Sequence, residues 1–397
     1  MATSARLSFL SLPVLGLALH AALPALAVGR PHEPRVHPSD VKNAQLLATA
    51  ELRLAKGQAA AALEALWSID DSRPKLDRFT RARLLGRAAF AAERYEDARA
   101  ALEEARALTV ARGYRLRADL ELLRARAEHA LGHCEPALAA LERAGRERFD
   151  DVPAVLVEAA CLAEGGLRAG AVEALSVGLA RQEDARLRAA RTRLLVEIGA
   201  RTAALVDARR AAAAMPLEDA LLMAHDFVEA GALSEATELL RALRQRAPDD
   251  VRPRLALSRL VTGREAAAVA VEAARLDPSR RADAAELLRR DGALSAALRE
   301  TAGIAEPRAR LRARLAVLID ARAWDRALAL QAQLRDADLS KDDAVRYALA
   351  FAAFSVGDDT QASAFLDGIV DAGLFERASR LRVAIAACAE TDSPCAR

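Results

Sequence analysis

One residue type, alanine, recurs along this chain at a spacing that few folds accommodate. Ten alanines follow one another at intervals of between 30 and 39 residues. A period near 34 residues is the length of one helical hairpin, and a stack of such hairpins buries each apolar face only against the neighbouring units. The sequence therefore predicts an all-α fold, an α-solenoid of about ten helical hairpins. The alanines are Ala62, Ala98, Ala137, Ala171, Ala204, Ala236, Ala266, Ala297, Ala327 and Ala362.

Glycine and proline mark the ends of the expected helices. Glycine stands five residues before seven of the ten alanines, where a left-handed residue ends the first helix of a pair. Proline stands twelve residues after four of them, a position that suits the exit from one hairpin. These breaks argue against one continuous coiled coil, and the 53% hydrophobic content argues against disorder. The glycines are Gly57, Gly132, Gly166, Gly199, Gly231, Gly292 and Gly357, and the prolines are Pro74, Pro216, Pro248 and Pro278.

The segment that holds Leu85, Gly86, Tyr95, Ala98, Leu102 and Ala105 resembles a tetratricopeptide repeat, as does the ending 273–278 of a later unit. Leu102 and Ala105 follow Ala98 at plus four and plus seven, on one helix face. The likeness covers roughly residues 40–390. It implies a right-handed solenoid whose concave groove is lined by the first helix of each pair. Thr301 and Gln331 stand where apolar residues are expected, so the register of the eighth and ninth units stays open, as does another type of helical-hairpin array.

The first 27 residues have the pattern of a cleavable secretory signal. A short segment with one positive charge precedes the apolar stretch Leu7–Leu26, and residues 25–27 form a small-x-small cleavage pattern. The predicted organisation is a signal peptide (1–27), a flexible leader (28–39) in which Ser39 is a candidate N-cap, helical repeats (40–373), and a C-terminal capping helix and tail (374–397). An uncleaved membrane anchor is the alternative reading of the first segment.

The charge balance limits the classes of partner. Cleavage after residue 27 removes one base and no acid, which leaves 57 bases against 56 acids, a net charge of +1. Nucleic-acid binding needs a basic surface, so no nucleic-acid partner is expected. No run of 18 apolar residues follows the signal, so no membrane span is expected in the mature chain. We expect a mostly monomeric protein that is periplasmic or secreted, in a bacterium.

Four cysteines in an exported chain meet an oxidising compartment. Three pairings are possible, and the spacing favours the local one, with Cys134 joined to Cys161 and Cys388 joined to Cys395. The second pair would tie the tail back onto a closing helix at 375–390, whose arginines are expected to point outward. Four free thiols are the alternative.

No catalytic motif is recognisable in this sequence. Nucleophile elbows, phosphate-binding glycine loops and zinc-protease motifs are all missing, so no enzyme activity and no cofactor are predicted. His129, His133 and Cys134 have a spacing that metal ligands use, but Gly132 interrupts the helix there. Turn polarity explains this cluster adequately, and no metal site is predicted.

The resemblance places four arginines on the concave face, namely Arg83, Arg87, Arg126 and Arg193. A basic groove would bind an acidic peptide or an anionic polymer. Acids map to the same face, so the arginines are alternatively paired with them. The lysine and asparagine that hold C-terminal carboxylates in this family are missing here. Two functions follow: a non-enzymatic interaction scaffold for proteins of the cell envelope, of the kind that accompanies polysaccharide secretion or outer-membrane assembly, or a periplasmic binder or chaperone of an acidic peptide or anionic polymer.

Overall fold

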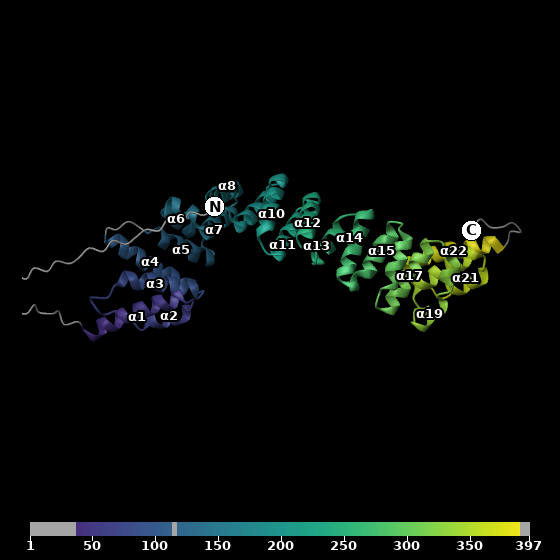
Figure 1. Ribbon diagram of the computed structural model, residues 1–397, viewed down its shortest axis with the longest axis horizontal. Helices are drawn as coiled ribbons and strands as arrows, with labels where there is room; N and C mark the ends of the chain where they lie inside the picture. Colours follow the sequence, from purple (N-terminus) through teal and green to yellow (C-terminus); the bar gives the residue numbers. More distant parts are fainter. Residues whose placement is uncertain (1–36, 113–116, 390–397) are drawn as a thin grey trace, which may run out of the picture.

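The computed structural model describes residues 37–112 and 117–389, and every regular element in these two ranges is a helix. Figure 1 shows the helices as pairs stacked in chain order, from α1 at the lower left, upward to α8 and then to the right as far as α22. All substantial packing between described helices joins elements that are near neighbours along the chain. The fold is therefore an all-α solenoid, as the alanine period predicted.

The first helices of successive hairpins line up along one face of the array. The first helices are α1 (Pro38–Ala55), α3 (Arg78–Ala91), α5 (Ala118–Ala130), α7 (Val152–Glu164), α9 (Ala185–Glu197), α11 (Leu217–Glu229), α13 (Arg252–Leu260), α15 (Arg281–Arg290), α17 (Pro307–Asp320) and α20 (Asp343–Val356). Short 3₁₀ segments, η1 (Gly145–Asp150) and η2 (Pro278–Arg280), precede α7 and α15.

The second helix of each hairpin carries the recurring alanine, and all ten alanines are at most 2% exposed. Alanine recurs there because the two helices of a pair approach too closely for a larger side chain. The second helices are α2 (Ala59–Trp67), α4 (Tyr95–Ala111), α6 (Cys134–Ala144), α8 (Arg168–Arg181), α10 (Arg201–Ala214), α12 (Leu233–Arg246), α14 (Gly263–Leu276), α16 (Leu294–Ala302), α18 (Trp324–Leu328) with α19 (Gln331–Asp336), and α21 (Asp359–Leu366).

The packed face of the second helix follows the predicted plus-four and plus-seven positions. In α4, Leu102 and Ala105 are 1% and 0% exposed. Gly86 of α3 makes room for this face, because a Cβ atom at that position would lie 2.6 Å from Leu102 Cγ. Each buried leucine contributes about 1.5–3 kcal/mol relative to an exposed one, so these faces hold each hairpin together.

In nine of the ten hairpins the residue five positions before the alanine is left-handed, and in two of these nine it is not glycine. Glu93 and Arg322 take the glycine position before Ala98 and Ala327, with φ of 60° and 51°. The third exception is Val261, which is extended, with φ of −93° and ψ of 164°. Because a β-branched residue avoids the left-handed region, the hairpin of α13 and α14 has a different turn from the others.

The ninth unit, where the register was open, has a broken second helix. This second helix is interrupted between Leu328 and Gln331, so it consists of two short helices, α18 and α19. In the eighth unit Thr301 is 1% exposed, and its hydroxyl donates to the Leu298 carbonyl at 2.8 Å. Thr301 therefore occupies the apolar position with its polar group satisfied inside its own helix.

The ends of the array differ in detail from the sequence expectation. Helix α1 begins at Pro38 and its N-cap is His37, whose Nδ1 accepts from the Ser39 amide, so Ser39 is not the cap. The predicted signal peptide and the tail beyond residue 389 lie outside the described residues. None of the described helices is long and apolar enough to cross a membrane.

The final helix, α22 (Ala372–Ala389), packs on α20 and α21 and closes the array. Arg377 and Arg380 are exposed as expected. Arg382 is half-buried instead, because its guanidinium donates to the Leu366 carbonyl at 2.6 Å. Phe375 and Val383 remain 59% and 70% exposed, so the outer face of α22 is less polar than a capping helix requires.

Candidate functional site

The four predicted arginines lie on first helices, Arg83 and Arg87 on α3, Arg126 on α5 and Arg193 on α9. Three of them are paired with acids about one repeat away. Arg83 lies 3.8 Å from Glu51, Arg126 contacts both carboxylate oxygens of Asp151, and Arg193 donates to Asp226 at 3.3 Å. At these three positions the arginines are thus paired with acids within the array, as the alternative reading had it, and a binding role for them stays a prediction.

Arg87 is the exception among the four. It is exposed and has no ion pair with any described residue. It lines a cavity of about 410 Å³ beside Arg126 and Asp151, which already hold each other. One unpaired arginine next to a closed ion pair is not a basic patch.

Ion pairs of this kind recur between neighbouring repeats along the array. Arg289 pairs with Asp320, Arg308 with Asp338 and Arg312 with Asp342. In each case the acid lies on the next first helix or on the turn before it. These arginines therefore link neighbouring hairpins.

The row of first helices is interrupted at one place. Successive first helices pack directly against each other from α1 to α11, and again from α15 through α17 and α20 to α22. On both sides of α13 this direct packing is weak. The interruption leaves two cavities, and we call the two together the α13 groove.

The local sequence explains why α13 fits the row poorly. Helix α13 has 9 residues and its neighbour α15 has 10, against 13 in α11 and 14 in α17. At its start, Asp250 accepts from the Arg252 amide at 2.8 Å and Pro253 occupies the first turn, so the helix begins late. At its end, Val261 and Thr262 continue as extended chain before α14.

The first cavity lies between α11 and α13 and has a volume of about 520 Å³. Its lining is mostly apolar, and the charged or titratable groups among its lining residues are basic or imidazole. They are Leu221, Ala224, His225 and Val228 of α11, Leu240 of α12, and Arg252, Leu255, Ala256, Arg259 and Leu260 of α13. Its size is within the range of pockets that hold small ligands or peptide side chains.

The second cavity lies between α13 and α15, at the start of α14, and has a volume of about 600 Å³. Its charged lining is mixed. Arg280 is paired with Asp277, and Arg290 donates to Glu286 at 2.7 Å. Hydrogen bonds from Arg289 hold the pKa of Glu286 below its ordinary value, so this carboxylate is ionised at neutral pH.

Arg259 lines both cavities and stands between them. It is exposed and has no ion pair with any described residue, unlike Arg252, which is held by Asp250 at 2.8 Å. Asp283 and Asp291 of the second cavity are also exposed and likewise lack an ion pair within the described residues. The α13 groove therefore offers an apolar hollow, then a free cation, then two free carboxylates.

The histidine and cysteine cluster serves the turn and a disulfide. His133 Nδ1 lies 3.1 Å from the Glu128 carboxylate, and Cys134 is bonded to Cys161 with a Cα–Cα distance of 5.1 Å. This is the local pairing that the sequence favoured. Within the described ranges no cluster of histidine, cysteine and carboxylate side chains is arranged to hold a metal ion.

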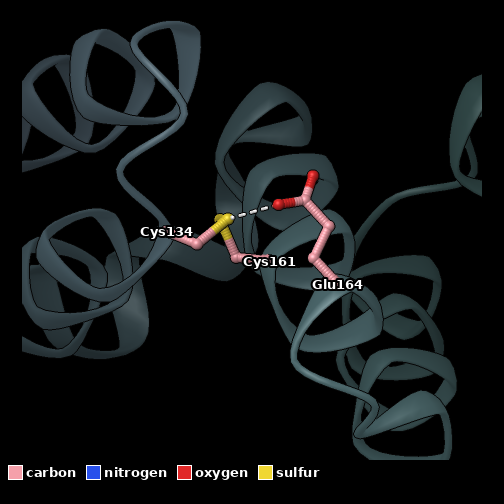
Figure 2. Close-up of a disulfide and its surroundings, with 3 residues drawn as sticks. All are labelled: Cys134, Cys161 and Glu164. Atoms are coloured by element: carbon pink, nitrogen blue, oxygen red, sulfur yellow. Dashed lines mark hydrogen bonds between the residues drawn. A yellow bond between two sulfur atoms is a disulfide. The ribbon is translucent and has the colours of Figure 1, made fainter.

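The disulfide ties the start of α6 to α7, the first helix of the next hairpin (Figure 2). Glu164 Oε2 lies 3.1 Å from Cys134 Sγ, and the dashed line in Figure 2 marks this contact. Cys388 on α22 is also disulfide-bonded. Its predicted partner Cys395 lies outside the described residues, so that pairing stays a prediction.

Comparison with known proteins yields similarity of structure only. No protein-family model matches the chain, and no curated protein matches it. A human IFIT1 dimer with PPP-AAAA is 14% identical, with a TM-score of 0.30 over 86% of this chain and 94% of that chain. The APC/C hetero-tetramer Cut9-Hcn1 is 15% identical, with a TM-score of 0.31 over 88% and 77%.

Yeast Tom70 is 13% identical, with a TM-score of 0.31 over 88% of this chain and 96% of that chain. Similarity at this level carries no inference about function. The class of protein, a helical-hairpin solenoid, is defined by the helices of the chain itself.

Proposed function

We propose that this protein is a non-enzymatic interaction scaffold of the bacterial cell envelope, and that it holds a partner protein in the α13 groove. The observation that carries this proposal is the interruption of the first-helix row at α13. Elsewhere along that row successive first helices pack directly against each other, and arginines such as Arg83 and Arg193 are paired with acids about one repeat away. Two adjacent cavities of this size on one face of the array give another molecule a place to bind.

The envelope location rests on the sequence. The signal pattern at 1–27 supports export, and a disulfide between Cys134 and Cys161 suits an oxidising compartment. Within the envelope, a scaffold of a polysaccharide-secretion or outer-membrane-assembly system is the specific role that we propose.

The alternative function, a binder of anionic polymer, has less support. Such a polymer needs a continuous row of free cations, because its charge repeats along its length. Arg83, Arg126 and Arg193 are neutralised by their own neighbours. An acidic peptide, which needs only one or two cations, remains compatible with Arg259.

Site-specific photo-crosslinking tests the proposal. A benzophenone amino acid replaces His225, which lines the α11/α13 cavity, or Val206, which is 47% exposed on second helix α10. The full chain is expressed with its own N-terminus in a Gram-negative host, and the periplasmic form is sequenced. We expect a mature N-terminus near Val28 and discrete protein adducts at position 225 but not at position 206.

Two results would contradict this function. Recovery of the uncleaved chain in the cytosol contradicts the envelope location. Equal adduct patterns at positions 225 and 206 contradict the assignment of the partner to the α13 groove.

A further inference from the structure

We infer that the α13 groove recognises a polypeptide segment presenting, in spatial order, a large apolar side chain, a carboxylate and a cation. This inference rests on the proposed function and specifies the chemistry of the partner. It follows from the three regions of the groove, which lie in sequence across α13.

The apolar side chain belongs in the α11/α13 cavity. Leu221, Val228, Leu255 and Leu260 are each partly exposed to it, and Ala224 and Leu240 form buried parts of its lining. These side chains are as apolar as the core of a hairpin, yet no helix of the row covers them. Filling the cavity with a large apolar group removes that surface from water, which is the favourable term in such binding.

The carboxylate belongs on Arg259. Arginine binds carboxylates through two parallel N–H donors, and every such interaction is stronger when no internal acid competes. Arg252 is already held by Asp250, whereas Arg259 has no ion pair with any described residue. An acidic side chain next to the apolar anchor therefore meets one available guanidinium, at the boundary of the two cavities.

The cation belongs in the α13/α15 cavity. Arg280 and Arg290 of its lining are used by Asp277 and Glu286, which leaves Asp283 and Asp291 as the uncompensated charges. Asp291 Oδ1 lies close to the start of α14, 3.6 Å from the position that a Cβ atom on Gly263 would take. A basic residue of the partner complements these two carboxylates, and a second acidic residue there would be repelled.

The occupant is a polypeptide because no compact molecule reaches all three regions. The two cavities lie on opposite sides of α13, and only Leu255 and Arg259 line both. An extended chain advances about 3.3 Å per residue, so a few residues cross the helix and place different side chains on either side. A partner protein supplies such a segment.

Selection from a phage-displayed library of random dodecapeptides on the purified mature chain tests the inference. The selected sequences are expected to share a large apolar residue, an acidic residue and a basic residue in one order. Arg259→Glu should abolish selection for the acidic residue. It should also weaken binding of a synthetic peptide that was selected on the wild-type protein, by about tenfold or more. Asp283→Asn with Asp291→Asn should abolish selection for the basic residue and keep the acidic one.

Arg264→Glu is the matched control. Arg264 is exposed at the start of α14, has no ion pair with any described residue and lines neither cavity. Its replacement by glutamate changes the charge by the same amount as Arg259→Glu. Circular dichroism of all variants checks that they fold. The inference is overturned if selection gives no shared pattern, if the pattern lacks an acidic residue, or if Arg259→Glu and Arg264→Glu bind the peptide equally.

The outcomes separate this inference from the proposed function. Adducts at position 225 together with failure of the peptide selection would leave the scaffold function standing and remove the stated chemistry. If no adducts form at position 225 but the peptide selection succeeds, the stated chemistry stands and the scaffold function is contradicted. If sedimentation shows a dimer that Arg259→Glu dissociates, the occupant is a second copy of this chain and the assignment to a different partner is wrong.

Discussion

At the scale of single residues, the ion pairs of this chain range from buried to exposed. Asp207, 3% exposed on α10, accepts from Arg188 at 2.8 Å and from Arg191 at 2.6 and 2.8 Å. Arg191 also donates to Ser176 of α8 at 3.0 Å. This buried cluster joins three consecutive helices, whereas Arg193 and Asp226 form their pair at the surface.

Removing Asp207 should therefore cost much more than removing Asp226. Asp207→Ala removes the acceptor that Arg188 and Arg191 share, while Arg188 keeps its bonds to Glu183, and we expect a loss of about 2–3 kcal/mol in the free energy of unfolding. Asp226→Ala opens an exposed pair and should cost less than about 1 kcal/mol. Urea unfolding followed by circular dichroism measures both, and similar losses for the two variants would contradict the distinction.

Glu164 gives a second prediction at this scale. Its carboxylate lies 3.1 Å from the sulfur of Cys134, while Cys161 is 2% exposed and closed to attack. Reduction begins when a thiolate attacks the accessible sulfur, which breaks the S–S bond and releases the other sulfur as a thiolate. The carboxylate repels that incoming thiolate, so Glu164→Gln should speed reduction by glutathione by roughly two- to fivefold, the effect of a surface charge.

The matched control is Glu142→Gln, which is also exposed, lies on α6 with Cys134 and has no ion pair with any described residue. Cysteamine, a thiol with a positive charge, should reduce the wild type faster than glutathione does, and Glu164→Gln should narrow that difference. If the ratio of the two rates is the same in wild type and variant, Glu164 does not shield the disulfide.

At the scale of elements, the hairpin turn shows where glycine is missing. Glu93 and Arg322 hold a left-handed conformation that costs most residues about 1–2 kcal/mol. Glu93→Gly and Arg322→Gly should each raise the free energy of unfolding by about 1 kcal/mol. Thermal melting measures the gain.

The comparison variant Glu104→Gly places glycine at an exposed position within α4 and should lower stability by about 1 kcal/mol. A loss at Glu93 of the same size as at Glu104 would mean that the turn conformation carries no strain.

The sequence predicted the elements better than it predicted the site. The recurring alanine located every hairpin, because close packing of two helices leaves little choice of side chain. Arginines were harder to interpret. In the sequence, an arginine on a helix face has the same pattern whether it is paired with an acid one repeat away or has no acid partner. Arg126 and Arg259 both stand on first helices, but only Arg126 has an acid partner among the described residues.

One signal for the site was present in the sequence. Val261 stands where seven units have glycine, and a β-branched residue cannot make the left-handed turn. The late start of α13 at Arg252 could not be foreseen, because it depends on how Asp250 and Pro253 together end the preceding turn. The cavities depend on spacings between helices, which no single repeat encodes.

At the scale of the whole molecule, stability should depend on the ionisation of many carboxylates. Hydrogen bonds from arginine lower the pKa of acids along the array, so their folded values lie below their unfolded ones. The stabilisation of the fold by these carboxylates is therefore fully present at a pH above their ordinary pKa, which is 4.5 for glutamate. It is lost as the pH falls through their lower pKa values in the folded chain. The acids include Glu103, Asp184, Asp250, Glu265 and Glu286.

We expect the melting temperature to be nearly constant from neutral pH to about pH 5 and to fall progressively between about pH 5 and pH 3. Concentrated salt should make the fall shallower, because most of these pairs are exposed and screened. A melting temperature that does not change over this range would show that the exposed pairs contribute nothing to folding.

The packing of each hairpin only on its near neighbours has a consequence for how the chain reaches this structure. Even the long side-chain bonds, such as Arg246 to the Ala212 carbonyl, span 34 residues, and the bridge from Cys134 to Cys161 spans 27. Chains with such short loops to close fold rapidly from local contacts. As the polypeptide emerges from a ribosome or a translocation pore, each hairpin can thus settle on the one before it, without waiting for residues still to come.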